Sequence, residues 1–139
     1  MVPKIFFTSL KTPAEKVRFL IKVVSDHYLK NHKMIIFTQD LKTAQFVDNL
    51  LWSEPKESFL PHFMSQSLID EKIVITCEKS NLNEAKIALN LTGQPLNPID
   101  LKLHTIFEIE DLSALEKAAL FKKKLLVYQK SKLTIISLQ

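Results

Sequence analysis

Two strand-like runs near the N-terminus, each followed by a helical pattern, constrain the fold more than any other feature. Lys4 to Ser9 is rich in residues that favour strands, and the run from Met34 to Thr38 is almost entirely apolar, as in a strand covered on both faces. Between them, residues 13–30 carry apolar side chains at the spacing of one helix face. A second helical pattern runs from Asp40 to Leu51. Strands and helices therefore alternate, which predicts βαβ units and a parallel sheet.

Three segments have the residues that begin helices. Thr12–Glu15 has the pattern of a capping box, with proline at the first helical position. Asp40 is a suitable N-cap for the helix that follows it. Ser113–Glu116 repeats the capping-box pattern, so we expect a last helix from there through about Gln129.

The rest of the chain continues the alternation of strands and turns. Further strands are expected at residues 73–76, 87–91 and 105–109, with a weaker one at 133–138 on the edge of the sheet. Residues 92–98 contain glycine, asparagine and two prolines, as loops do. The elements predict a single α/β domain over residues 1–139, with three layers (α/β/α) and a mostly parallel central sheet.

The composition argues against several kinds of functional site. Gly93 is the only glycine, whereas phosphate-binding loops need several, so a P-loop or a dinucleotide-binding turn is not expected. The four histidines and one cysteine lack the spacing of a zinc site. The acidic pair Glu108 and Glu110 is explained by a solvated face. We therefore predict no catalytic group, metal or cofactor.

Three features predict a cytoplasmic protein. Cys77 is the single cysteine, which rules out an internal disulfide, suits a reducing compartment and is expected to be a buried structural thiol. No apolar run approaches the roughly 20 residues of a membrane helix. The N-terminus lacks the long apolar region of a signal peptide.

Residues 51–62 combine the only tryptophan with two prolines, a phenylalanine and a histidine. Pro55 and Pro61 fix φ and remove backbone donors, so this segment is expected to be irregular and rigid. Trp52 and Phe59 can each bury about 150–250 Å². Two interpretations stay open: the rings close the end of the core, or they form the centre of an interface, where preorganised aromatic side chains are favoured.

The run W-x-x-P-x-E-S-F-x-P-H at residues 52–62 resembles the matching segment of the chi subunit of bacterial DNA polymerase III, an accessory protein of its clamp-loader assembly. Chain length and element order are similar too, which implies a Rossmann-like topology. In that family this segment contributes to the surface that binds the small psi subunit, and a helicase-like alternative partner uses overlapping residues. By position, the resemblance implies partner binding through Trp52, Pro55, Phe59, Pro61 and His62.

The last predicted helix is strongly basic. Every charged residue from Lys117 to Lys132 is a lysine, and helix-dipole preferences do not explain so uninterrupted a run. The resemblance implies a ligand for it, because chi proteins tether the acidic, phenylalanine-terminated C-terminal tail of the single-stranded DNA-binding protein. Lysines would neutralise the tail's carboxylates while apolar side chains hold the ring. The residues expected to bind the tail are Lys122, Lys124, Leu125, Leu126 and Tyr128.

Together with the missing glycine loops and the basic last helix, the resemblance thus implies a non-catalytic adaptor that links the clamp loader, through psi, to the single-stranded DNA-binding protein. Two alternatives stay open. One is an α/β enzyme acting on a nucleotide or nucleic acid, which the architecture alone suggests. The other is a direct single-stranded DNA-binding module, which a pI of about 9.1 permits.

Overall fold

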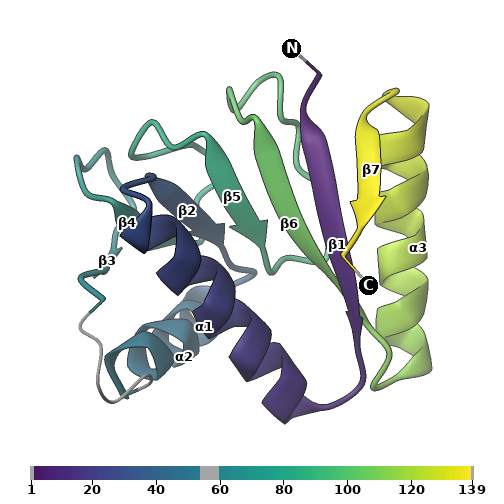
Figure 1. The fold of residues 1–139 in the computed structure, drawn as a ribbon, viewed down its shortest axis with the longest axis horizontal. Coiled ribbons are helices and arrows are strands. Elements are labelled where there is room, and N and C mark those ends of the chain that lie inside the picture. Colours follow the sequence, from purple (N-terminus) through teal and green to yellow (C-terminus); the bar gives the residue numbers. More distant parts are fainter. Residues whose placement is uncertain (1, 54–59, 139) are drawn as a thin grey trace.

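The computed structural model describes residues 2–53 and 60–138, which form one sheet with helices on both faces (Figure 1). Its elements in chain order are β1 (Lys4–Leu10), α1 (Pro13–Leu29), β2 (Met34–Phe37), α2 (Leu41–Ser53), β3 (Phe63–Met64), β4 (Ile73–Thr76), β5 (Ile87–Asn90), β6 (Thr105–Asp111), α3 (Leu115–Lys130) and β7 (Thr134–Ser137). The strand order is β3-β4-β2-β5-β6-β1-β7, and every pairing among the described residues is parallel. The predicted parallel sheet is therefore confirmed.

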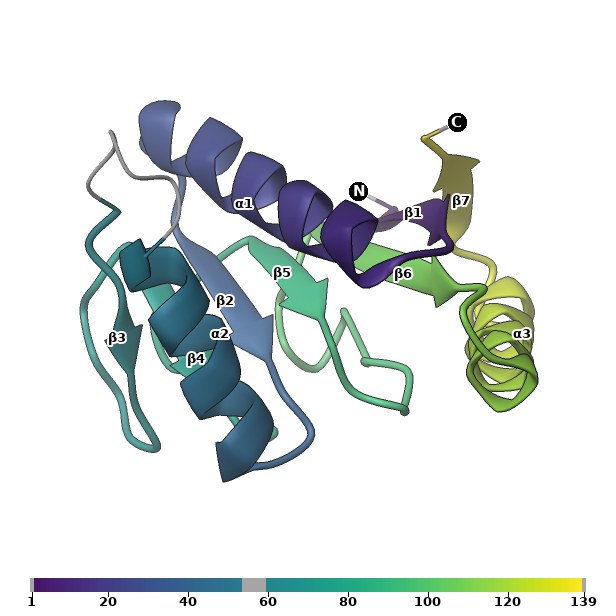
Figure 2. The same ribbon diagram turned by 90° about the horizontal axis from the view of Figure 1, so that it is seen from below.

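The helices divide between the two faces of the sheet (Figure 2). α1 and α2 pack on one face, and α3 packs on the other. Strand β2 shows how the faces alternate: Met34 and Ile36 enter the core under α1 and α2, whereas Ile35 joins a second core with Tyr128 of α3. Because helices cover both faces, the strand is apolar at every position. The three-layer α/β/α architecture predicted from the sequence is confirmed.

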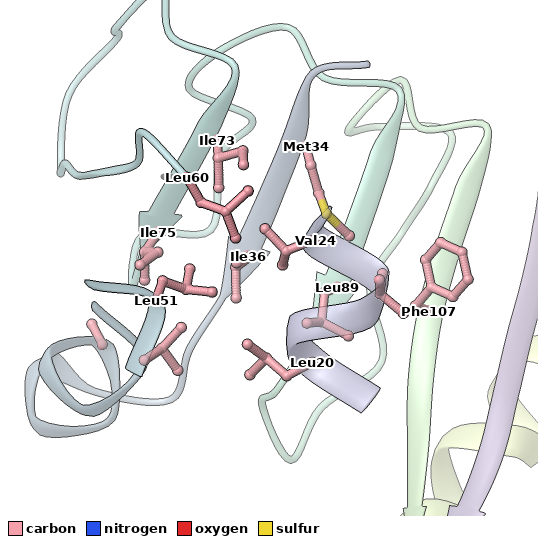
Figure 3. Close-up of a cluster of buried hydrophobic side chains, with 13 residues drawn as sticks. Leu20, Val24, Met34, Ile36, Leu51, Leu60, Ile73, Ile75, Leu89 and Phe107 are labelled. Carbon is pink, nitrogen blue, oxygen red and sulfur yellow. The ribbon is translucent and has the colours of Figure 1, made fainter. Parts of the chain in front are cut away.

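The core beneath α1 and α2 also contains Leu60, which lies before β3 (Figure 3). Leu20 and Val24 of α1 and Leu51 of α2 meet strand side chains such as Ile36. Fully burying one such side chain stabilises the fold by about 1.5–3 kcal/mol. Leu60 joins the same cluster at 3 % exposure, so the chain is anchored in the core there.

The helix starts confirm two of the three predicted caps. Thr12 and Glu15 form the capping box of α1, and the Asp40 carboxylate accepts a hydrogen bond from a backbone N–H in the first turn of α2. At α3 the prediction is wrong: the N-cap is Ala114, which has no capping side chain. The Ser113 hydroxyl and N–H instead bind the carboxylate two residues earlier, a local turn that competes with capping.

Residues other than glycine occupy the left-handed backbone positions. Asn31, Glu84, Lys102 and Lys132 have φ values between 57° and 62°. Asn31 follows α1 and Lys132 follows α3, and both helix ends are closed by the paired backbone hydrogen bonds of a Schellman motif. Glycine or asparagine is usual at this position, so Lys132 holds its conformation at some cost in free energy.

Candidate functional site

The sheet has a topological switch at the neighbouring strands β1 and β6. The chain leaves β1 through α1 on one face and leaves β6 through α3 on the other. In open α/β sheets, ligands bind in the crevice beyond the carboxyl ends of such strands. A cavity of about 410 Å³ lies there, between the ends of β5 and β6 and the first half of α3; we call it the lysine cavity. Its lining includes the cations Lys16, Lys117 and Lys124 and the apolar side chains Leu91, Ile109, Leu120 and Phe121.

One carboxylate holds two of these lysines. Asp111 Oδ2 lies 2.8 Å from Lys16 Nζ and 3.7 Å from Lys117 Nζ. Partial burial alone would raise the pKa of Asp111, but hydrogen bonds from Lys16 and Ser113 outweigh burial and lower this pKa to about 2. Asp111 is therefore ionised at neutral pH and keeps two ammonium groups beside the cavity.

A second carboxylate, fully buried, joins α3 to the sheet. Glu108 on β6 is 0 % exposed, and its Oε1 accepts a hydrogen bond from Lys124 Nζ at 2.8 Å. Its Oε2 accepts from the Tyr128 hydroxyl at 2.6 Å and from Asn90 Nδ2 at 2.7 Å. Burial raises the pKa of Glu108, while the interactions with Lys124, Tyr128 and Asn90 act in the opposite direction. Burial and the Glu108 carboxylate raise the pKa of Tyr128, so its hydroxyl remains a donor.

The prediction that Glu108 lies on a solvated face is wrong. β6 is an inner strand between β5 and β1, and both of its faces are covered. Phe107 enters the core of the α1–α2 layer, while the next residue points at α3 and meets a lysine and a tyrosine there. Glu110, nearer the strand end, is half-buried and accepts a hydrogen bond from Ser9. The sequence shows an acid between apolar residues but does not show which helix covers it.

The five side chains predicted on the last helix do not share one surface. Lys124 lines the lysine cavity, although it is 6 % exposed and paired with a buried acid. Tyr128 is 1 % exposed and binds the same acid. Lys122 and Leu126 face solvent, and Leu125 is half-buried. The structure therefore brings Lys124 and Tyr128 together and separates them from the other three.

The cavity also uses residues that sequence reasoning missed. Lys117, Leu120 and Phe121 lie three to seven positions before Lys124 and face the same side of α3. Their helical spacing places them on the same side as Lys124, but the sequence alone does not show that this side faces the cavity. Lys16 comes from the start of α1, and no pattern in the sequence connects it to this helix.

The predicted partner-binding segment is partly buried and partly exposed. Trp52, in the last turn of α2, is 51 % exposed, and its ring packs on the His62 ring with centroids 4.1 Å apart. His62 itself is 1 % exposed, and Pro61 is half-buried. Pro55 and Phe59 lie outside the described residues. In the described part of this segment, the Trp52 ring is exposed to solvent and the buried His62 ring supports it from beneath.

His62 holds this surface against α2. Its Nδ1 lies 2.6 Å from the Leu60 carbonyl oxygen, and its Nε2 lies 3.1 Å from the Asp48 carbonyl oxygen and 3.2 Å from Asp48 Oδ1. Phe63 follows on β3 and is 41 % exposed. We call Trp52, Pro61 and Phe63, with the buried His62 beneath, the Trp52 surface.

Other side chains with potential chemistry form no further site in the described part of the chain. Cys77 is half-buried rather than buried as predicted, because it lies just beyond the end of β4, where Gln66 Nε2 donates to its sulfur at 3.2 Å. No group of three or more possible metal ligands occurs within residues 2–53 and 60–138. In the same residues, no helix combines the length and apolar character needed to cross a membrane.

Fold and site together define a class: a parallel, three-layer α/β domain whose switch-point crevice is lined by lysines instead of a glycine-rich phosphate loop. The match to a known family is more specific. The family described as DNA polymerase III chi subunit, HolC, matches residues 2–129, and the chain belongs to this family. The protein is therefore of the kind that serves DNA polymerase III as an accessory subunit in DNA replication. No curated protein matches the chain.

Proposed function

We propose that this protein is a non-catalytic adaptor of the replicative polymerase. It binds psi, or a helicase-like alternative partner, through the Trp52 surface, and it binds the acidic C-terminal tail of the single-stranded DNA-binding protein beside α3. The observation that supports this best is the lysine cavity, in which cations and apolar side chains converge at a ligand-binding position of the fold.

The lining of the cavity matches a carboxylate that follows an apolar ring. Lys117 has a half-exposed side chain and Lys16 is partly exposed, so both ammonium groups are accessible to a carboxylate. Leu120 and Phe121 provide apolar walls for a terminal phenylalanine ring. A volume of about 410 Å³ is in the range of sites that hold small ligands, and a single side chain with its terminal carboxylate fits it.

The residues expected from the sequence have different parts in this proposal. Lys124 contributes charge inside the cavity, and Tyr128 helps to hold Lys124 and Glu108 in place. Lys122 adds to the positive potential that attracts an acidic peptide, an effect that salt screens. Leu125 and Leu126 do not line the cavity, so we expect them to contribute less than Leu120.

A titration with a fluorescent peptide that copies the tail tests this proposal. We expect micromolar binding that needs the terminal phenylalanine and that weakens about tenfold in Lys117→Glu, since reversing one accessible charge is worth about 1.4 kcal/mol. Lys86→Glu is the matched control, because this exposed lysine precedes β5 at the amino ends of the parallel strands, whereas the cavity lies at their carboxyl ends. Lys124→Glu is unsuitable because it would place a second carboxylate against the buried Glu108. Equal binding by wild type and Lys117→Glu would remove the proposed site.

Partner assembly tests the other surface. Trp52→Ala should weaken binding of psi at least tenfold, since large exposed aromatic side chains are favoured at interface centres. We expect tail binding to stay unchanged and the free energy of unfolding to fall by less than about 2 kcal/mol, because half of the ring is already exposed. If the free energy of unfolding of this variant instead falls by several kcal/mol, and that loss accounts for the whole assembly defect, the ring serves the core.

Direct binding of single-stranded DNA would use the same lysines and is one of two competing functions. Stacking of bases needs exposed aromatic rings, but Phe121 and Tyr128 of α3 are 3 % and 1 % exposed. Binding of single strands by the protein alone, with a steep dependence on salt, would favour this alternative over the adaptor. Measurable nucleotide or nucleic-acid turnover, abolished by a point mutation in the lysine cavity, would instead favour an enzyme.

A further inference from the structure

A second cavity follows the lysine cavity along α3. It has a volume of about 590 Å³ and lies between the end of α3, the N-terminal residues Val2 and Pro3, and the chain segment 95–100. Val127 and Lys132 contribute from the helix end and the turn after it. We call it the Val127 cavity.

The two cavities share the same two walls. One wall is the connection from β5 to β6, which contributes residues 90–93 to the lysine cavity and residues 95–100 to the Val127 cavity. The other wall is α3, which contributes Leu120 to the first cavity and Val127 to the second. These side chains are 43 % and 45 % exposed and lie seven residues apart, two turns along one side of the helix.

A hydrogen bond fastens these walls to each other. The backbone N–H of Leu96 donates to the Tyr128 hydroxyl at 3.1 Å, and that hydroxyl donates to the buried Glu108. The connection and the helix are therefore held at a fixed spacing between the two cavities. The polar network that holds Lys124 beside the first cavity is thus also bonded to Leu96, which lines the second.

We propose that residues upstream of the tail's terminus continue from the lysine cavity along Leu120 and Val127 into the Val127 cavity; this extension rests on the proposed function. Along the helix, Val127 lies about 10 Å and Ser131 about 16 Å beyond Leu120. An extended peptide covers about 3.3 Å per residue, so three to five of its residues span this distance. The side chain that enters the Val127 cavity is therefore about three to five residues before the terminus, and it is apolar because most residues that line the cavity are apolar.

The charges along this path suit an acidic segment. Lys123 lies between Leu120 and Val127 in the sequence of the helix, and Lys132 lines the second cavity. Among the ion pairs of residues 2–53 and 60–138, none involves either lysine, so both charges remain for carboxylates of a ligand. Asp100, the acid in the lining, binds the amide of Asn97.

Two peptides test this inference separately from the proposed function on which it rests. The short peptide is the last four residues of the tail, and the long peptide is the last ten. On the wild-type protein we expect the long peptide to bind about five- to tenfold more tightly than the short one. Val127→Glu and Ile99→Glu should each remove this gain and leave the affinity of the short peptide unchanged. Ile99 lies outside any helix and is 67 % exposed, so its variant keeps the test valid if the helix variant unfolds.

Leu115→Glu is the matched control, because Leu115 is 89 % exposed and lines neither cavity. It should bind both peptides as the wild type does. Equal affinity of the two peptides for the wild type, or a length gain that survives both cavity variants, would overturn the inference. Failure of the short and the long peptide alike to bind a folded sample would overturn the proposed tail binding itself.

Discussion

Lys124→Met tests how strongly the buried carboxylate depends on its lysine. The pair is separated by 2.8 Å, with side chains 8 % and 0 % exposed. At an effective dielectric constant of about 20, the attraction is about 6 kcal/mol, and the cost of removing both charges from water offsets much of it. Deleting the lysine leaves Glu108 buried without its cation, which typically costs about 3–5 kcal/mol. Since domains of this size are stable by about 5–15 kcal/mol, the variant should fold but unfold at markedly lower urea concentration.

The effect of pH on this variant distinguishes a buried charge from lost packing. Burial raises the folded-state pKa of Glu108, and removing Lys124 raises it further. A carboxyl whose pKa is higher in the folded than in the unfolded state contributes stability below the unfolded pKa of about 4.5, and this contribution is lost as pH rises through the folded pKa. The stability difference between wild type and Lys124→Met should therefore be smaller at pH 5 than at pH 7.

Urea unfolding followed by circular dichroism at both pH values measures this difference. The double variant Glu108→Gln with Lys124→Met is the matched control, because it removes both charges and should lie within about 2 kcal/mol of the wild type. A single variant as stable as the wild type, or a stability loss that is the same at both pH values and persists in the double variant, would refute the buried-charge argument.

Three further predictions concern stability and can be measured by the same unfolding assay. Thr12→Ala removes the capping box of α1 and should cost about 1 kcal/mol, whereas Thr12→Ser should cost much less. Lys132→Gly relieves a left-handed φ of 58° and should add about 0.5–1 kcal/mol, while Ser131→Gly, at a φ of −82°, should lower stability. Burial lowers the pKa of His27 below its usual 6.5. The wild type should therefore lose stability relative to His27→Gln as pH falls from about 6.5 through the folded pKa. Equal stability of the two proteins on acidification would show that burial of this ring is not coupled to its charge.

The fold could be predicted because local patterns and tertiary packing agree in it. The apolar run at Met34–Phe37 can be buried on both faces only in a covered parallel sheet, and the capping residue Thr12 fixes where the first helix begins. β3 was not predicted, since two residues show no periodicity. Ser113 failed as a cap because a nearby carboxylate competes for its donors, a contest that spacing alone cannot decide.

The candidate site could be predicted less well because it depends on which faces meet. Lysines on the last helix were visible in the sequence, but the pairing of Lys124 with Glu108 across 16 positions decides that this lysine is buried rather than exposed. Lys16 approaches the same cavity from the other end of the chain. Neither the burial of Lys124 nor the position of Lys16 follows from helical periodicity, since both depend on how α3 packs against the inner strands of the sheet.

The pairing of β1 has a consequence for how this chain comes to be folded. In the described residues β1 pairs with β6 and β7, and Lys4 lies opposite Thr105, 101 positions away. Strand β1 thus has no neighbour in this sheet until about a hundred further residues have been synthesised. Such distant pairing slows folding and leaves an apolar strand edge open to other chains in the meantime. Premature termination before β6 would therefore yield an aggregating fragment rather than a smaller domain, because the Ile-Phe-Phe strand would have no internal partner.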